Sequence, residues 1–124
     1  MRNLRLVLAV LQGPTSRHRY GRHRCNRADL HLPPGPGPHR VAILIHGGSW
    51  KARYSRRMMR AVARDLTSRG WAAWNIEYRR VGRGQGGGWP ATFEDGSIYR
   101  ADSKEMAERI RAGELRPEGA SSQA

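Results

Sequence analysis

A strand–helix–strand pattern over residues 40–78 limits the folds that are open to this chain. Residues 41–45 are an unbroken aliphatic run that is too short for an ordinary helix, so they predict a strand buried on both faces. Ser55 then stands where a helix cap belongs, apolar residues recur at helical spacing, and Gly70 predicts the end of the helix. A second strand over residues 71–78 completes a parallel β-α-β unit, which places the chain in the α/β class.

The segment before this unit predicts little regular structure. Residues 13–27 hold five arginines and almost no aliphatic side chain. Such a segment cannot bury enough apolar surface to offset the entropy lost on ordering. We therefore expect residues 1–27 to form a basic, disordered segment. Alternating apolar and polar residues then predict a half-buried strand over residues 28–32.

The carboxyl-terminal part predicts one helix that is separate from the sheet. Residues 82–88 form a glycine-rich loop, and Gly96 is expected to break any helix that begins before it. Asp102 stands where a cap belongs, and a helix with a thin apolar stripe then runs to Gly113. The organisation expected is therefore a structured portion over residues 28–95, followed by a divergent tail over residues 96–124.

Charge suggests one class of partner for a chain of this size. The 124 residues are enough for about one domain, and they carry 23 Lys and Arg against 10 Asp and Glu, a net charge of +13. Cationic surfaces bind nucleic acid by releasing counterions from phosphates, but the sequence contains no helix-turn-helix, zinc-finger or RNP-like motif. We expect five arginines to line the solvent side of the helix before Gly70: Arg53, Arg56, Arg57, Arg60 and Arg64. A small basic non-enzymatic binding protein, with weak and sequence-independent affinity for nucleic acid, is thus the alternative interpretation of function.

Several other classes are excluded. Cys25 is the single cysteine, so no internal disulfide can form, and no Cys/His set has zinc-ligand spacing. No apolar run approaches the ~18–20 residues that span a bilayer. We therefore expect a cytoplasmic protein that binds neither metal nor membrane. Residues 82–87 match the G-x-G-x-x-G dinucleotide fingerprint, but Pro90 follows where the fingerprint needs a helix, so no cofactor is expected.

Adjacent glycines follow the first strand of the β-α-β unit, in the sequence His46-Gly47-Gly48-Ser49-Trp50. This is the end of a strand at which open α/β sheets place their sites. Glycine lets the backbone approach a ligand closely, so that N–H groups point into a crevice. Such donors could build an oxyanion hole, and a tight turn out of the strand is the alternative interpretation.

This strand and its H-G-G sequence resemble the oxyanion-hole segment of α/β-hydrolase esterases and lipases. Further segments occur in the order of that family: residues 28–33, 69–71, 75–79 and 88–91. The resemblance therefore covers about residues 20–95. The subgroup it most resembles contains small carboxylesterase-like and kynurenine-formamidase-like hydrolases. The resemblance implies an incomplete α/β-hydrolase fold, restricted to its amino-terminal portion, and a small-molecule carboxylic ester or amide as substrate of the family.

The resemblance also implies roles for the residues of the H-G-G segment. The N–H groups near Gly47 and Gly48 would stabilise the oxyanion of a tetrahedral intermediate, where one donor is typically worth roughly 3–4 kcal/mol. His46 would hold the loop rather than act as the base, and Trp50 would pack along it. The segment that contains Glu77 would form a structural polar network.

The catalytic residues of that family are not found. In that family a G-x-S-x-G elbow carries the nucleophile, and an acid and then a histidine follow it along the chain. The nearest match to the elbow is residues 47–51, where lysine stands in place of the last glycine. No histidine follows His46, so no later serine can be followed by a histidine base. After Asp95 the family pattern stops. We therefore expect a truncated, frameshifted or fused hydrolase that lacks nucleophile, acid and base and has little activity. A partner chain that supplies the rest of the fold is a further interpretation. A sheet of two or three strands covered by one helix is expected to be marginally stable.

Overall fold

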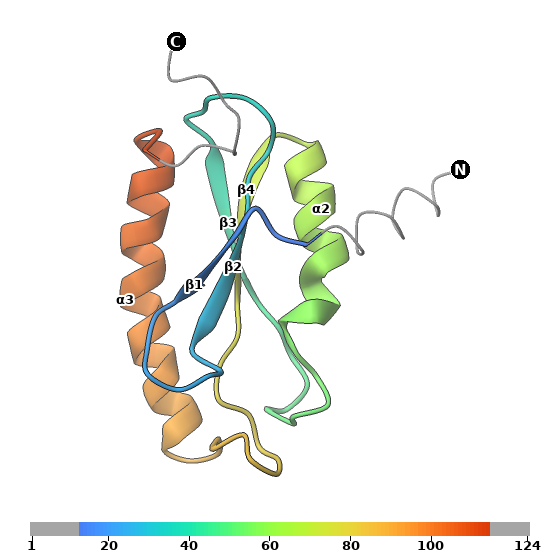
Figure 1. The fold of residues 1–124 in the computed structure, drawn as a ribbon, viewed down its shortest axis with the longest axis vertical. Helices are drawn as coiled ribbons and strands as arrows, with labels where there is room; N and C mark the ends of the chain where they lie inside the picture. Colours follow the sequence, from blue (N-terminus) through green and yellow to red (C-terminus); the bar gives the residue numbers. More distant parts are fainter. Residues whose placement is uncertain (1–12, 115–124) are drawn as a thin grey trace, which may run out of the picture.

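A mixed sheet of four strands lies between two helices (Figure 1). The structure is a computed structural model that describes residues 13–114. The strand order is β1-β2-β4-β3, with β1–β2 and β2–β4 antiparallel and β3–β4 parallel. The strands have these bounds: β1 Ser16–Arg19, β2 Arg27–His31, β3 Arg40–Ile45 and β4 Trp71–Ile76.

The predicted β-α-β unit is present. A 3-10 turn, η1 (Arg56–Met59), leads into α2 (Arg60–Ser68), and this helical segment connects the parallel strands β3 and β4. Ser55 caps the segment as predicted, because its side chain accepts a hydrogen bond from the N–H of Arg57 at 3.2 Å. Gly70 follows the helix with a φ of 85°, a conformation that favours glycine.

The prediction that β3 is buried on both faces is wrong. β3 is the last strand of the sheet within residues 13–114, and Ile43 and Ile45 are 43% and 49% exposed. On the opposite face, Leu44 is buried together with Ala63 of α2 and Ala73 of β4. An aliphatic run identifies a strand, but the number of covered faces depends on packing with distant elements.

The expectation of disorder before residue 28 is wrong for residues 16–19, which form β1. These residues pair with β2 over the register Ser16↔Leu30 to Arg19↔Arg27, and the backbone hydrogen bonds of this ladder do not require apolar side chains. The ring of His18 also packs on that of Trp74, with 5.1 Å between the centroids. Residues 1–12 of the predicted segment lie outside the described residues.

The expected break at Gly96 is absent, because one helix, α3 (Ala91–Arg111), runs through both Gly96 and Asp102. A glycine within a helix costs only about 1 kcal/mol, and this helix buries Ile110 fully in the main core of the protein. That core combines residues of β2, β4 and α3: Ala28, Leu30, Leu32, Ala72, Trp74, Ile76, Met106 and Ile110. The helix is therefore part of the fold rather than a separate tail. Its predicted end is confirmed, with Gly113 beyond it at a φ of 75°.

The two helices cover opposite faces of the sheet (Figure 1). Consecutive strand residues face opposite sides, so Trp74 contacts the core under α3 while Ala73 contacts α2. β2 is buried on both sides, which differs from the half-buried strand expected there: Asp29 and His31 are both 0% exposed on the α2 side. No helix within residues 13–114 is long and apolar enough to cross a membrane.

Candidate functional site

A groove of about 560 Å³ lies between β3, the loop that follows it and the first half of α3. The exposed isoleucines of β3 form one wall, and α3 contributes aromatic and polar side chains to the other. The predicted H-G-G segment stands at this groove, since both His46 and Gly47 line it. The residues that line it include Ile43, Ile45, Gly47, Trp50, Phe93 and Tyr99.

The loop after β3 turns sharply and depends on glycine at one position. Gly48 has a φ of 115°, and a Cβ atom there would lie 2.2 Å from Cδ2 of Tyr54. Ser49 and Trp50 also have positive φ values, 52° and 64°. Gly47 differs, because a Cβ atom there would have no atom within 4 Å. Only Gly48 is therefore required by steric constraints.

The N–H groups of the two glycines have no acceptor among the described residues. Among the hydrogen bonds within residues 13–114, none is donated by the N–H of Gly47 or Gly48. The turn is closed instead by the N–H of Lys51, which donates to the carbonyl oxygen of Gly48 at 3.0 Å. Two neighbouring donors are thus available at the end of β3, where the sequence predicts an oxyanion hole.

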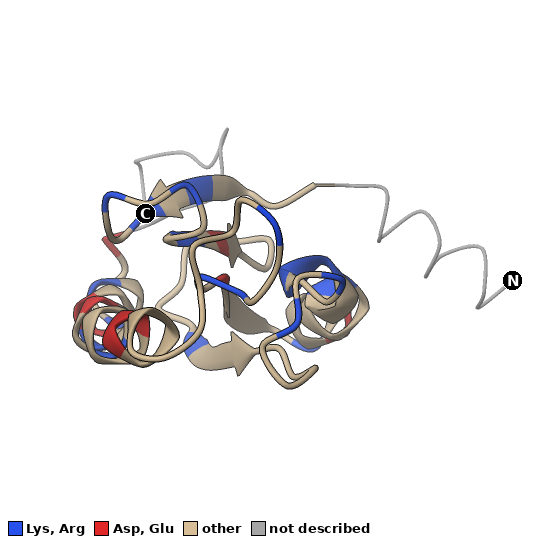
Figure 2. Cartoon of the chain, turned by 90° about the horizontal axis from the view of Figure 1, so that it is seen from below, with Lys and Arg blue, Asp and Glu red and all other residues tan. Residues whose placement is uncertain are grey.

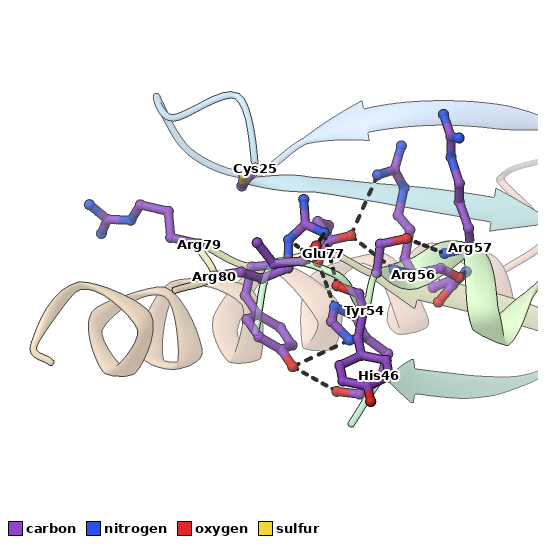
Figure 3. Close-up of polar contacts among 12 residues, drawn as sticks. Cys25, His46, Tyr54, Arg56, Arg57, Glu77, Arg79 and Arg80 are labelled. Carbon is purple, nitrogen blue, oxygen red and sulfur yellow. Dashed lines mark hydrogen bonds and ion pairs between the residues drawn. The ribbon is translucent and has the colours of Figure 1, made fainter. Parts of the chain in front are cut away.

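His46 is buried and held on three sides (Figure 3). Its Nε2 lies 2.5 Å from Oε1 of Glu77, and its Nδ1 lies 2.9 Å from the carbonyl oxygen of Gly47. The ring stacks on Tyr78 at 4.4 Å, and the Tyr78 hydroxyl donates to the His46 carbonyl oxygen at 2.8 Å. Both ring nitrogens of His46 therefore have a protein partner within residues 13–114.

The Glu77 carboxylate is the centre of this polar network. Burial raises its pKa, but hydrogen bonds from His46 and from the N–H of Arg56 outweigh that effect, so its pKa lies below the usual value. Oε2 accepts from the Arg56 N–H at 2.9 Å, and Nε of Arg80 lies 3.4 Å from Oε1. Because an ionised carboxylate only accepts hydrogen bonds, Nε2 of His46 carries the hydrogen in their contact.

Arg56 is partly buried, with 15% of its side chain exposed, and it faces the sheet, so its predicted place on the solvent side of the helix is wrong. Its Nε donates to Oδ2 of Asp29 at 3.0 Å, and its carbonyl oxygen accepts from the Asn75 side chain at 2.8 Å. The 3-10 turn directs this arginine toward Asp29 of β2 and toward Glu77, the residue that follows β4. No local sequence signal indicated this pairing, because Asp29 stands at a polar position of the alternating segment 28–32.

A second buried pair, which sequence analysis missed, fixes the start of α3. The Asp95 carboxylate is fully buried and accepts from the N–H and Nε of Arg79 at 2.7 and 2.9 Å. The hydroxyl of Thr92 donates to the Arg79 carbonyl oxygen at 2.6 Å. These contacts hold the groove-lining turn of α3 against the end of β4.

The groove contains serines but no nucleophile–base pair. Ser49, Ser97 and Ser103 line it, and within residues 13–114 no hydrogen bond joins any of them to a histidine. A serine–histidine hydrogen bond does occur on β1, where Ser16 Oγ lies 2.8 Å from Nε2 of His18, but neither residue lines the groove. Trp50 is 41% exposed and forms part of the groove surface. Among the described residues, no cluster of three His, Cys, Asp or Glu side chains could hold a metal ion.

Comparison with known families agrees with this arrangement. The BD-FAE family model matches residues 28–98, which is more than half of the 124 residues. The chain belongs to the BD-FAE family. This family is associated with α/β-hydrolase-like esterases, so the resemblance noted in the sequence is confirmed at that level.

Among solved structures, the BD-FAE chain is similar to a bifunctional GH43-CE protein of Bacteroides eggerthii. The two are 20% identical with a TM-score of 0.59, and the match covers 81% of this chain. It covers only 13% of the other chain, so the similarity concerns the fold alone. No curated protein matches the chain.

Proposed function

We propose that this BD-FAE chain provides the oxyanion-binding part of an esterase-type site for a small carboxylic ester or amide. The observation that carries the proposal is the pair of neighbouring N–H groups at Gly47, which lines the groove, and at Gly48, since neither has an acceptor within residues 13–114. Family membership supports the reaction class. The buried contacts of His46 support the loop geometry, since they fix the residue that precedes Gly47.

The groove offers a carbonyl group both polar and apolar contacts. The carbonyl oxygen would accept hydrogen bonds from the two N–H groups, and the acyl or alcohol group would lie against Ile43, Ile45 and Phe93. Donors of this kind stabilise negative charge as it develops on the oxygen. The serines of the groove lack a histidine partner within residues 13–114, so we propose that this part of the chain binds an ester but hydrolyses it little.

Backbone amide NMR tests the proposal directly. Titration of the ¹⁵N-labelled chain with ethyl butyrate, an uncharged ester, is expected to shift the amide signals of Gly47 and Gly48 downfield. The Phe93→Ala variant should weaken the effect, whereas Ile98→Ala, on the same helix but outside the groove lining, should not. Unchanged glycine signals, or shifts confined to residues outside the groove, would refute the proposal.

A further inference from the structure

Several arginines of this protein lie on the same face of the sheet, the face covered by α2. On β1, His18 points toward Trp74 in the core under α3, so its neighbours Arg17 and Arg19 point to the opposite, α2 side. Arg27 faces the same side, because it pairs with Arg19 in the antiparallel register. The amino-terminal hairpin therefore presents three arginines on one side.

The helix on that side adds further arginines. The apolar contacts of α2 involve Leu44 on β3 and Ala73 on β4. On the same face, the residues of β1 and β2 are polar or charged. Burial lowers the pKa of Arg60; the nearby charge of Asp29 raises it, and the charges of Arg57 and Arg17 lower it further. Guanidinium groups of the helix and of β1 thus share one region, which we call the arginine face: Arg17, Arg19, Arg27, Arg57 and Arg60.

Asp29 compensates part of this positive charge. Asp29 is the acidic residue of β2 on this side, but it is fully buried and its Oδ2 accepts from Arg56. Of the nine acidic residues within residues 13–114, five lie instead on α3, across the sheet (Figure 2). Within residues 13–114, the buried Nε atoms of Arg27 and Arg60 have no hydrogen-bond partner. The excess positive charge of the exposed guanidinium groups on this side favours an anionic ligand.

We propose that the arginine face binds the phosphate backbone of nucleic acid, independently of base sequence. Guanidinium groups donate paired hydrogen bonds that match the geometry of phosphate oxygens, and the whole face consists of arginine rather than lysine. Its side chains come from two segments that are distant in sequence, so a phosphate chain lying across β1 and η1 would contact both. The face is separate from the groove, and none of its residues lines that cavity.

Fluorescence anisotropy with labelled duplex DNA of about 20 base pairs tests this inference, using the full chain between about 50 and 200 mM KCl. The variant Arg17→Gln/Arg57→Gln should weaken binding at least roughly tenfold at the lower salt concentration. Its slope of log K against log salt should fall by about 2, since each phosphate contact contributes about 0.9. The matched control is Arg83→Gln/Arg111→Gln, which removes two exposed arginines outside the face and should change binding little.

All four substituted residues are exposed, so circular dichroism should show the same fold for both variants. An equal loss of affinity in the two variants would show that binding reflects overall charge, and would overturn the inference. Absence of binding at the lower salt concentration would overturn it as well. So would displacement of the DNA by polyglutamate at equal charge concentration, because carboxylates would then serve as well as phosphates.

Discussion

The Glu77 carboxylate accepts hydrogen bonds from separate segments of the chain, and its removal would leave buried donors unpaired. We expect Glu77→Ala to lower the free energy of unfolding by about 3–5 kcal/mol, because the charge of Arg80 and the ring of His46 would lose a buried partner. Glu77→Gln, which keeps one acceptor oxygen, should lower it less. Urea denaturation measures both values. A loss below about 1 kcal/mol for the alanine variant would contradict the assigned role.

Gly47 and Gly48 are neighbours with opposite tolerance of a side chain. Gly48→Ala should destabilise the protein by about 1–3 kcal/mol, because it combines a φ of 115° with a contact of 2.2 Å to Tyr54. Gly47→Ala should change the free energy of unfolding by less than about 0.5 kcal/mol, since its Cβ would meet no atom within 4 Å. Thermal unfolding of the two variants provides the comparison, and equal losses would show that the loop has another conformation.

The groove was only partly predictable from individual residues. The spacing of His46 and the two glycines after a strand identified one wall. The other wall could not be found in this way, because Phe93 and Tyr99 reach the groove only through the packing of α3. Arg56 shows the same limit. Its helical spacing predicted a side chain on the solvent side of the helix. The 3-10 turn instead directs this side chain toward the buried Asp29.

At the scale of elements, local patterns predicted the β-α-β unit and missed the elements that depend on distant partners. Each element of that unit has a signal in its own sequence. β3 has an aliphatic run, the helical segment that includes α2 has a cap at Ser55 and a stop at Gly70, and the sequence of β4 predicts a strand. β1 has no apolar pattern and is ordered by pairing with β2, which no local rule shows. α3 continues through Gly96 because burial of its later turns outweighs a weak local propensity.

The role of α3 as a covering helix yields a prediction at this scale. Ile110 is fully buried in the main core, so Ile110→Ala should lower the free energy of unfolding by about 2–5 kcal/mol. Arg111→Ala, an exposed change at the next position, should have an effect within about 0.5 kcal/mol. Guanidinium denaturation followed by tryptophan fluorescence measures both. If Ile110→Ala had no effect, the helix would not be packed on the sheet.

For the whole molecule, the exposed β3 edge and the apolar groove predict marginal stability. Ile43, Ile45 and Phe93 are between 43% and 57% exposed around one groove, a surface that binds apolar dyes and other apolar surfaces. We expect the chain to unfold at low denaturant concentration and to bind ANS near neutral pH, with less binding in Phe93→Ala. A sharp cooperative transition with full near-UV dichroism and no ANS binding would contradict this expectation.

Acid should destabilise the whole molecule through His31. Burial lowers the pKa of this histidine from 6.5 to about 4, so the folded state binds fewer protons than the unfolded state between these values. The free energy of unfolding therefore falls as the pH drops from about 6.5 to about 4, by up to about 3 kcal/mol. Glu77 acts in the same direction at lower pH, because its pKa is below the usual value and its contribution is lost as it becomes protonated.

The His31→Leu variant isolates this contribution. Both ring nitrogens of His31 lack a hydrogen-bond partner within residues 13–114, so leucine removes no protein hydrogen bond. We expect its stability near neutral pH to stay close to that of the parent chain, and its loss of stability between pH 6.5 and about 4 to be clearly smaller. Denaturant titrations at a series of pH values measure the difference. The same pH dependence in both proteins would mean that His31 becomes protonated without unfolding, and that its ring is more accessible than its burial indicates.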